Sequence, residues 1–103
     1  VGGDQATNNT ALGSNALLFN TKGYDNTAVG YKALYSDTTG YNNNAMGCYA
    51  LFSNLYGCFN TAVGTNSLYS NTTGYFNSAM GYSSLYHNTT GNNNSALGNE
   101  ALY

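Results

Sequence analysis

The chain has 103 residues, of which only 6% are charged, and its formal net charge is −2. Two basic residues provide no electrostatic footprint for nucleic acid, and no apolar run approaches the roughly 20 residues of a membrane-spanning helix. With 42% hydrophobic and 15% aromatic residues, the composition does not resemble that of a disordered segment. These values leave a small folded domain, rich in asparagine, threonine, glycine and tyrosine.

Residues 1–8 form an N-terminal lead-in, and residues 9–103 then repeat with a period of 17 residues and no insertions. The repeats are 9–25, 26–42, 43–59, 60–76 and 77–93, with a truncated sixth at 94–103. The consensus is Asn-Thr-Ala-Val-Gly-Tyr-Asn-Ala-Leu-Tyr-Ser-Asn-Thr-Thr-Gly-Tyr-Asn, and positions are numbered from its first asparagine. Residues at one position form a column that occupies the same environment in every repeat.

The length of the repeat predicts an all-β fold. A unit of 17 residues is too short for a pair of helices, which takes about 33 residues or more, but it suits one coil of a β-solenoid, or β-roll. We expect two short strands of about five residues in each coil. Glycine at positions 5 and 15 is expected to adopt positive φ in the turns. About six coils, stacked about 4.8 Å apart, would span roughly 29 Å.

Two aliphatic columns are predicted to form a thin core, with the small residues at positions 3 and 8 allowing the chain segments to approach closely. The column at position 4 contains Leu12, Val29, Met46, Val63, Met80 and Leu97, and the column at position 9 contains Leu17, Leu34, Leu51, Leu68, Leu85 and Leu102.

Position 1 is asparagine in every repeat. An unvarying amide column predicts a buried ladder of side-chain hydrogen bonds along the stack, and the alternative is a polar row that faces a ligand. This column contains Asn9, Asn26, Asn43, Asn60, Asn77 and Asn94.

Cys48 and Cys58 occupy positions 6 and 16 of one repeat, where other repeats often have tyrosine. Two changes to cysteine within one coil predict that the thiols are neighbours and form a disulfide, which indicates an oxidising, extracellular setting. The alternative is two separate buried thiols.

Catalysis and metal binding are not expected. Two cysteines and one distant histidine do not supply a four-ligand zinc site. The carboxylates of Asp4, Asp25, Asp37 and Glu100 fall in different columns or repeats and do not form an acid–base pair. The sequence therefore predicts a protein that is not an enzyme and needs no cofactor.

Tyrosine columns are the main candidates for recognition. Tyr35, Tyr69 and Tyr86 share position 10 with Tyr103, and Tyr24, Tyr41 and Tyr75 share position 16. Stacked rings stabilise a ladder or a chain–chain interface, whereas exposed rings can stack on sugars. Both readings remain open at this point.

The unit Asn26-Thr27-Ala28-Val29-Gly30 resembles the head repeat of trimeric autotransporter adhesins, and more closely the repeats of bacterial and phage tail-fibre-like proteins. This resemblance covers 9–103, although the adhesin repeat is a few residues shorter than 17 and has no counterpart of the Asn-Thr-Thr-Gly-Tyr segment. The resemblance implies a β-roll whose chains pack side by side in threes and whose role is adhesion.

The predicted function is a structural segment of an extracellular fibre or filament, located at a cell surface or on a virion. Its expected partners are copies of itself, in a trimer or an end-to-end filament, because exposed edge strands at bare ends invite polymerisation. A glycan or receptor on a host surface is a further candidate partner. The alternatives are an ice-binding β-solenoid, using threonine rows at positions 2 and 13, and a carbohydrate-binding module using the tyrosine rows.

Overall fold

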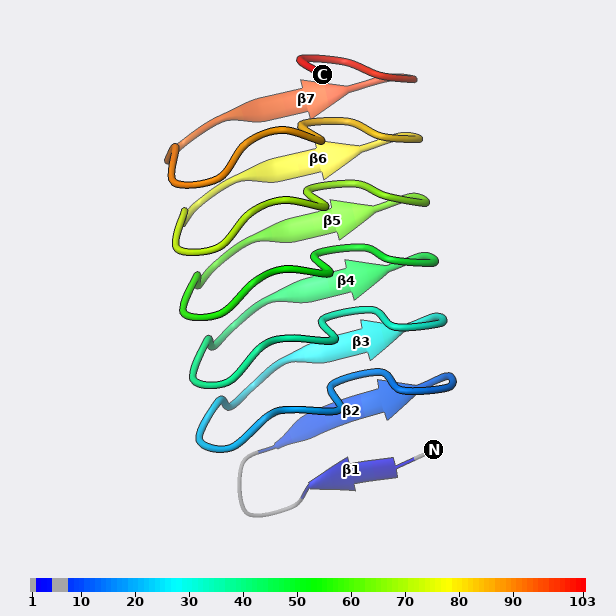
Figure 1. The fold of residues 1–103 in the computed structure, drawn as a ribbon, viewed down its shortest axis with the longest axis vertical. Coiled ribbons are helices and arrows are strands. Elements are labelled where there is room, and N and C mark those ends of the chain that lie inside the picture. Colours follow the sequence, from blue (N-terminus) through cyan, green and yellow to red (C-terminus); the bar gives the residue numbers. More distant parts are fainter. Residues whose placement is uncertain (1, 5–7) are drawn as a thin grey trace.

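The computed structural model describes residues 2–4 and 8–103, which form a single stack of coils around a seven-stranded sheet (Figure 1). The strands are β1 (Gly2–Asp4), β2 (Asn9–Leu12), β3 (Thr27–Val29), β4 (Asn44–Met46), β5 (Thr61–Val63), β6 (Ser78–Met80) and β7 (Ser95–Leu97). Their order in the sheet is their order in the sequence.

Strands β2 to β7 are parallel, and each residue pairs with the residue 17 positions further along, as Ala45 does with Ala62. The fold is therefore a β-solenoid of 17-residue coils, with five complete coils and part of a sixth, as the repeat predicted. The described chain measures 35 × 22 × 15 Å. Its longest dimension agrees with six coils and one additional strand at about 4.8 Å each.

Strand β1 is the exception to this parallel order. It pairs antiparallel with β2, placing Gly2 opposite Ala11 and Asp4 opposite Asn9, and so covers the edge of the first coil. Of the predicted lead-in 1–8, residues 1 and 5–7 lie outside the described residues. Strand β1 is thus the edge strand at this end of the sheet.

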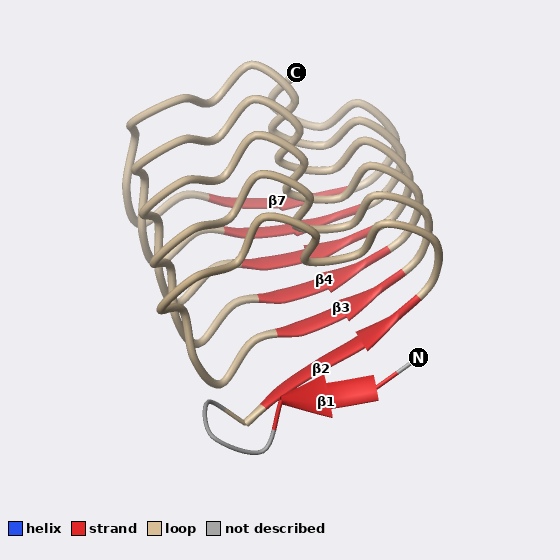
Figure 2. Cartoon of the chain, turned by 60° about the horizontal axis from the view of Figure 1, so that its bottom comes forward, coloured by secondary structure: helices blue, strands red, loops and turns tan. Residues whose placement is uncertain are grey.

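Each coil contains one strand of three or four residues, not the two of about five that we expected. The opposite side of the coil consists of turns (Figure 2). Positions 7, 9 and 17 have positive φ in every coil, and these left-handed residues curve the chain away from a strand path. Backbone hydrogen bonds still join the coils there, as when Leu51 N–H donates to Ser67 O at 3.0 Å.

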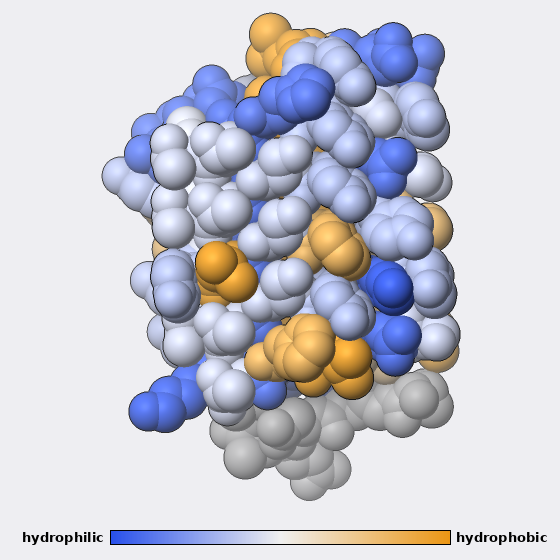
Figure 3. All heavy atoms as spheres, in the orientation of Figure 1, coloured by the Kyte–Doolittle hydropathy of each residue, from blue (hydrophilic) through white to orange (hydrophobic). Residues whose placement is uncertain are grey.

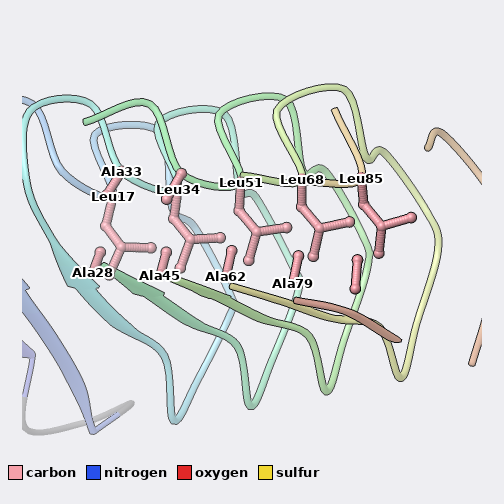
Figure 4. Packing of buried hydrophobic residues seen from close by; sticks show 12 residues of the cluster. Leu17, Ala28, Ala33, Leu34, Ala45, Leu51, Ala62, Leu68, Ala79 and Leu85 are labelled. Carbon is pink, nitrogen blue, oxygen red and sulfur yellow. The ribbon is translucent and has the colours of Figure 1, made fainter. Parts of the chain in front are cut away.

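The core consists of one leucine column facing one alanine column (Figure 4). Leucines at position 9 project across the coil onto alanines at position 3, and both columns are buried from the second coil to the fifth. Position 8 lies beside them, where Ser67 and Ser84 are buried and donate to Gly64 O and Gly81 O at 2.8 and 3.0 Å. Leu17, Leu34, Leu51, Leu68 and Leu85 are confirmed as core residues, whereas Leu102 in the last coil is 64% exposed.

The predicted core column at position 4 is wrong. Leu12, Met46 and Met80 are each about half exposed, Leu97 is 78% exposed, and Val29 and Val63 are only half-buried. Neighbouring residues of a strand point to opposite faces, so burial of the alanine at position 3 places positions 2 and 4 outside. The solenoid is so thin that the leucine side chains leave room only for alanine beneath them.

The asparagine column at position 1 is the predicted buried ladder. Asn60 N–H donates to Asn43 Oδ1 at 3.0 Å, while Asn43 Nδ2 donates to Gly57 O of its own coil at 2.8 Å. The same two bonds recur from Asn9 to Asn77, and each amide thus joins two coils and closes one. Asn94 is half-buried, and its N–H continues the ladder by donating to Asn77 Oδ1.

A second ladder, which we did not predict, runs along position 12. Asn71 Nδ2 donates to Asn54 Oδ1 at 2.9 Å, and Asn88 Nδ2 donates to Asn71 Oδ1 at 3.0 Å. Asn71 Nδ2 also approaches Gly74 O at 3.1 Å. This column contains Asn20, Asp37, Asn54, Asn71 and Asn88.

The two glycine columns serve different purposes. At position 5, Gly64 has φ +125°, a conformation that is essentially restricted to glycine, as we expected. At position 15, the expected positive φ does not occur. A Cβ on Gly57 would instead collide with Asn54 Oδ1 and the Gly74 carbonyl, so glycine is required there because the ladders leave no space.

Candidate interaction surface

The exposed side of the sheet, which we call the strand face, carries the side chains of positions 2 and 4 of β2–β7. Position 4 provides the aliphatic column that was predicted to be core. Position 2 provides a polar column that contains Thr10, Thr27, Asn44, Thr61, Ser78 and Ser95. Because the strands are in register, both columns run straight along the stack.

None of these side chains is charged, so the strand face is neutral along its whole length. Between β5 and β7 it carries a shallow groove of about 360 Å³, lined by Thr61, Ser78, Met80, Ser95 and Leu97 among others. A neutral aliphatic strip bordered by hydroxyl groups is suited to a flat partner that needs no ion pairs. By contrast, the side of the molecule shown in Figure 3 is mostly weakly polar, with scattered apolar residues.

The position 10 column forms a continuous aromatic stack. The rings of Tyr35, Phe52, Tyr69, Tyr86 and Tyr103 lie 4.9 to 5.3 Å apart between centroids. Neighbouring planes differ by between 4° and 21°. Burial raises the pKa of Tyr69 in the middle of this stack. The predicted tyrosine row is thus extended by Phe52.

This stacking bears on sugar recognition. A sugar packs against the face of an aromatic ring, but here each ring face is covered by the next ring of the column. What the column offers outward is ring edges and tyrosine hydroxyl groups. The geometry therefore favours the structural reading of Tyr35, Tyr69 and Tyr86 over stacking on a glycan.

The second predicted row is interrupted. Tyr24 and Tyr41 stack at 4.9 Å with planes 6° apart, but Cys58 then takes the place of a ring at position 16. Phe59 at position 17 meets Tyr41 edge-on at 5.5 Å and stacks on Phe76 at 4.9 Å. Tyr75 contacts Phe76 edge-on. Phe59 and Phe76 were missed because position 17 is polar in the other repeats, and only the departure from that pattern signalled them.

Lys32 provides a cation beside the first aromatic column. Its Nζ lies 5.2 Å from the ring centroid of Tyr31 and 5.1 Å from that of Tyr35, within the range of a cation–π interaction. A hydrogen bond with Tyr31 raises the pKa of Lys32. The amine therefore stays protonated and anchored on the turn side of the coil.

The predicted disulfide is wrong, because Cys48 and Cys58 are both free thiols. Position 6 follows the strand and position 16 precedes the next one, so the two residues lie at opposite ends of the strand segment. Each column contacts its own counterpart in the adjacent coils. A hydrogen bond with Cys58 accordingly raises the pKa of Tyr41, the position 16 residue of the preceding coil.

Within the described part of the chain, no group of three histidine, cysteine, aspartate or glutamate side chains is placed to hold a metal ion. The same residues contain no helix long and apolar enough to cross a membrane. No protein-family model, curated protein or solved structure matches this chain. The strand face and the stacked columns are therefore the features of this chain that bear on its function.

Proposed function

We propose that this chain is a non-catalytic structural segment of an extracellular fibre or surface filament, and that copies of it associate side by side through their strand faces. The observation that carries the proposal is the aliphatic column at position 4. Isolated exposed apolar residues are ordinary, but an unbroken apolar strip along a sheet marks an interaction surface.

A second copy of the same chain is the partner that this strip matches best. Both copies would present a straight neutral strip of equal length and equal coil spacing, so the contacts repeat in every coil and no charge is buried. The reversed strand β1 interrupts the parallel register at one end of the stack, which favours lateral association over end-to-end stacking. The resemblance to adhesin heads and tail fibres points to three chains and an adhesive role.

Analytical ultracentrifugation of the purified chain tests this proposal. We expect a discrete species at a small multiple of 10.9 kDa, with three the expected number. Adding two carboxylates to the strip in Met46→Asp/Met80→Asp should convert this species to a folded monomer. The matched control, Thr39→Asp/Thr73→Asp, adds the same charge at exposed position 14, away from the strand face, and should keep the wild-type mass.

A wild-type chain that is folded and monomeric up to millimolar concentration would overturn the self-association proposal. That result would favour ice as the occupant of the strand face, because the column at position 2, which carries a hydroxyl group everywhere except at Asn44, and the aliphatic column at position 4 form a regularly spaced surface. Thermal hysteresis of the same monomer would then decide the ice-binding alternative.

A further inference from the structure

Asp37 is the one carboxylate in the second amide ladder, where the other repeats have asparagine. It is fully buried. In a regular step of this ladder, Nδ2 of one residue donates to Oδ1 of the residue in the preceding coil. An aspartate has no nitrogen to donate, so the step between Asp37 and Asn20 requires a different arrangement.

The structure places Oδ2 of Asp37 at the point where a regular step of the ladder has the Nδ2 nitrogen of an asparagine. A Cβ built on Gly57 would lie 2.9 Å from Asn71 Nδ2, and one built on Gly23 would lie 2.9 Å from Asp37 Oδ2. In both coils the same Cβ would collide with Oδ1 of the preceding ladder residue, which at Gly23 is Asn20. Asp37 Oδ2 therefore faces Asn20 Oδ1, as a ladder nitrogen faces its acceptor.

Because Asp37 has no nitrogen, Asn20 Oδ1 lacks the donor that a ladder asparagine would provide. It is a buried oxygen that has no hydrogen-bond donor among the described residues. Two oxygens that face each other without a hydrogen repel, and a buried acceptor left without a donor is costly. A single proton on Asp37 Oδ2 would resolve both problems, because O–H is the donor that this step of the ladder lacks.

We propose that Asp37 is a neutral carboxylic acid in the folded chain, that its O–H donates to Asn20 Oδ1, and that loss of this proton makes the first coils a pH-sensitive part of the solenoid. Between about pH 4 and pH 7, folding thus takes up one proton, and the contribution of this carboxyl to stability is largest at the acid end of that range.

The surroundings of the carboxyl favour the neutral form. Asn20 and Gly23 face it from the preceding coil, Asn26 and Gly40 from its own coil, and Asn54 from the following coil. None of the described groups that shift its pKa carries a charge. Burial raises the pKa of Asp37 to about 7, although hydrogen bonds from Asn54, at 2.7 Å to Oδ1, and from the Gly40 backbone oppose this shift.

The sign of the pH dependence follows from linkage. In the unfolded chain Asp37 ionises near its ordinary value of 3.8, and in the folded chain near 7. The folded chain therefore binds the extra proton between these values, and stability falls as the pH rises from about 4 to about 7. The folding equilibrium constant should decrease by up to about tenfold per pH unit in this window.

Carboxyl carbon NMR on the wild-type chain tests the protonation state directly. We expect the Asp37 Cγ resonance to titrate with a midpoint near pH 7. A midpoint near pH 4 would overturn the proposal, because the carboxyl would then be ionised at the pH where its proton is required.

Denaturant unfolding between pH 4 and pH 8 tests the consequence for the fold. Asp37→Asn restores the amide of the column, so this variant should lose the stability decrease between pH 4 and 7 and exceed the wild type at pH 8. The control Asp25→Asn removes an exposed carboxylate at a left-handed position that is asparagine in two other repeats, and should keep the wild-type slope. Parallel profiles for the wild type and Asp37→Asn would also overturn the proposal, since the contributions of all groups that the two chains share cancel in their difference.

Discussion

Leucine at position 9 shows how a buried side chain can fix an unfavourable backbone. Leu34 and Leu51 have φ values of 50° and 51°, in the left-handed region that costs an L-residue roughly 1–2 kcal/mol. Both side chains are completely buried, and burial of a leucine contributes about 2 kcal/mol. The left-handed turn directs this side chain across the coil onto alanine, so the burial offsets the strain that makes it possible.

Alanine substitutions at two glycines of position 5 distinguish the cost of backbone strain from the cost of crowding between coils. Gly64→Ala and Gly98→Ala both place alanine at φ near 125°, which should cost about 1–3 kcal/mol. A Cβ on Gly64 would also lie 2.8 Å from the carbonyl carbon and oxygen of Gly81 in the next coil, whereas a Cβ on Gly98 meets only Ala101 Cβ at 3.9 Å. Gly64→Ala should therefore be the more destabilising by roughly 2 kcal/mol.

Guanidinium denaturation of the two variants measures this difference. Equal losses of stability would show that strain alone accounts for glycine at position 5 and that the coils can separate to admit a methyl group.

At the level of the single coil, the repeat predicted the architecture correctly and one of the two core columns incorrectly. The 17-residue period and the invariant asparagine predicted the coil, its stacking and the first ladder, because a column that never varies reports one fixed environment. The period could not show which of two adjacent apolar positions faces inward. Position 4 is more hydrophobic than the alanine at position 3, so hydropathy selected the wrong column, and only the reach of the opposing leucine decides the question.

The second ladder and the aromatic columns illustrate the same limit. Asn71-Thr72-Thr73-Gly74 has the composition of a turn, and the chain does bend there, so this composition did not separately indicate that Asn71 is buried in a hydrogen-bonded column. The tyrosine columns were visible from the sequence. Whether their ring faces were open to sugars depended on side-chain directions that a repeat pattern does not contain.

The position of the cysteines at opposite ends of a strand segment predicts two free thiols. In protein prepared without reductant and unfolded in guanidinium, a thiol-specific reagent should count two thiols per chain. Reduction before the assay should leave the count unchanged. A count of zero that rises to two after reduction would contradict the structure.

At the scale of the whole molecule, the fold is a one-dimensional stack in which each described strand contacts only the strands next to it. Such stacks are stabilised by the sum of their coil–coil interfaces. Removing one complete coil should therefore shorten the molecule without changing the rest. Deletion of 43–59 would bring 26–42 onto 60–76, so that each core leucine again contacts a leucine and each position 1 asparagine again contacts an asparagine. In the second ladder Asn71 would take the place that Asn54 has beside Asp37.

We expect the 43–59 deletion to retain the wild-type circular dichroism spectrum and to melt at a somewhat lower temperature. Deletion of 43–57 removes two residues fewer and serves as the control. It shifts the amide ladders and the leucine column out of register, so it should not fold cooperatively. Equal behaviour of the two deletions would contradict a fold that depends on strict register.

The direction of the hydrogen bonds between coils has a mechanical consequence. Strand pairing and both amide ladders join one coil to the next, along the long axis of the stack. A force that pulls the two ends of the chain apart therefore loads the coil interfaces one after another, and not all together. Under tension the solenoid would yield one coil at a time, each releasing 17 residues of slack, and would absorb work gradually where a shear-loaded sheet would break at once.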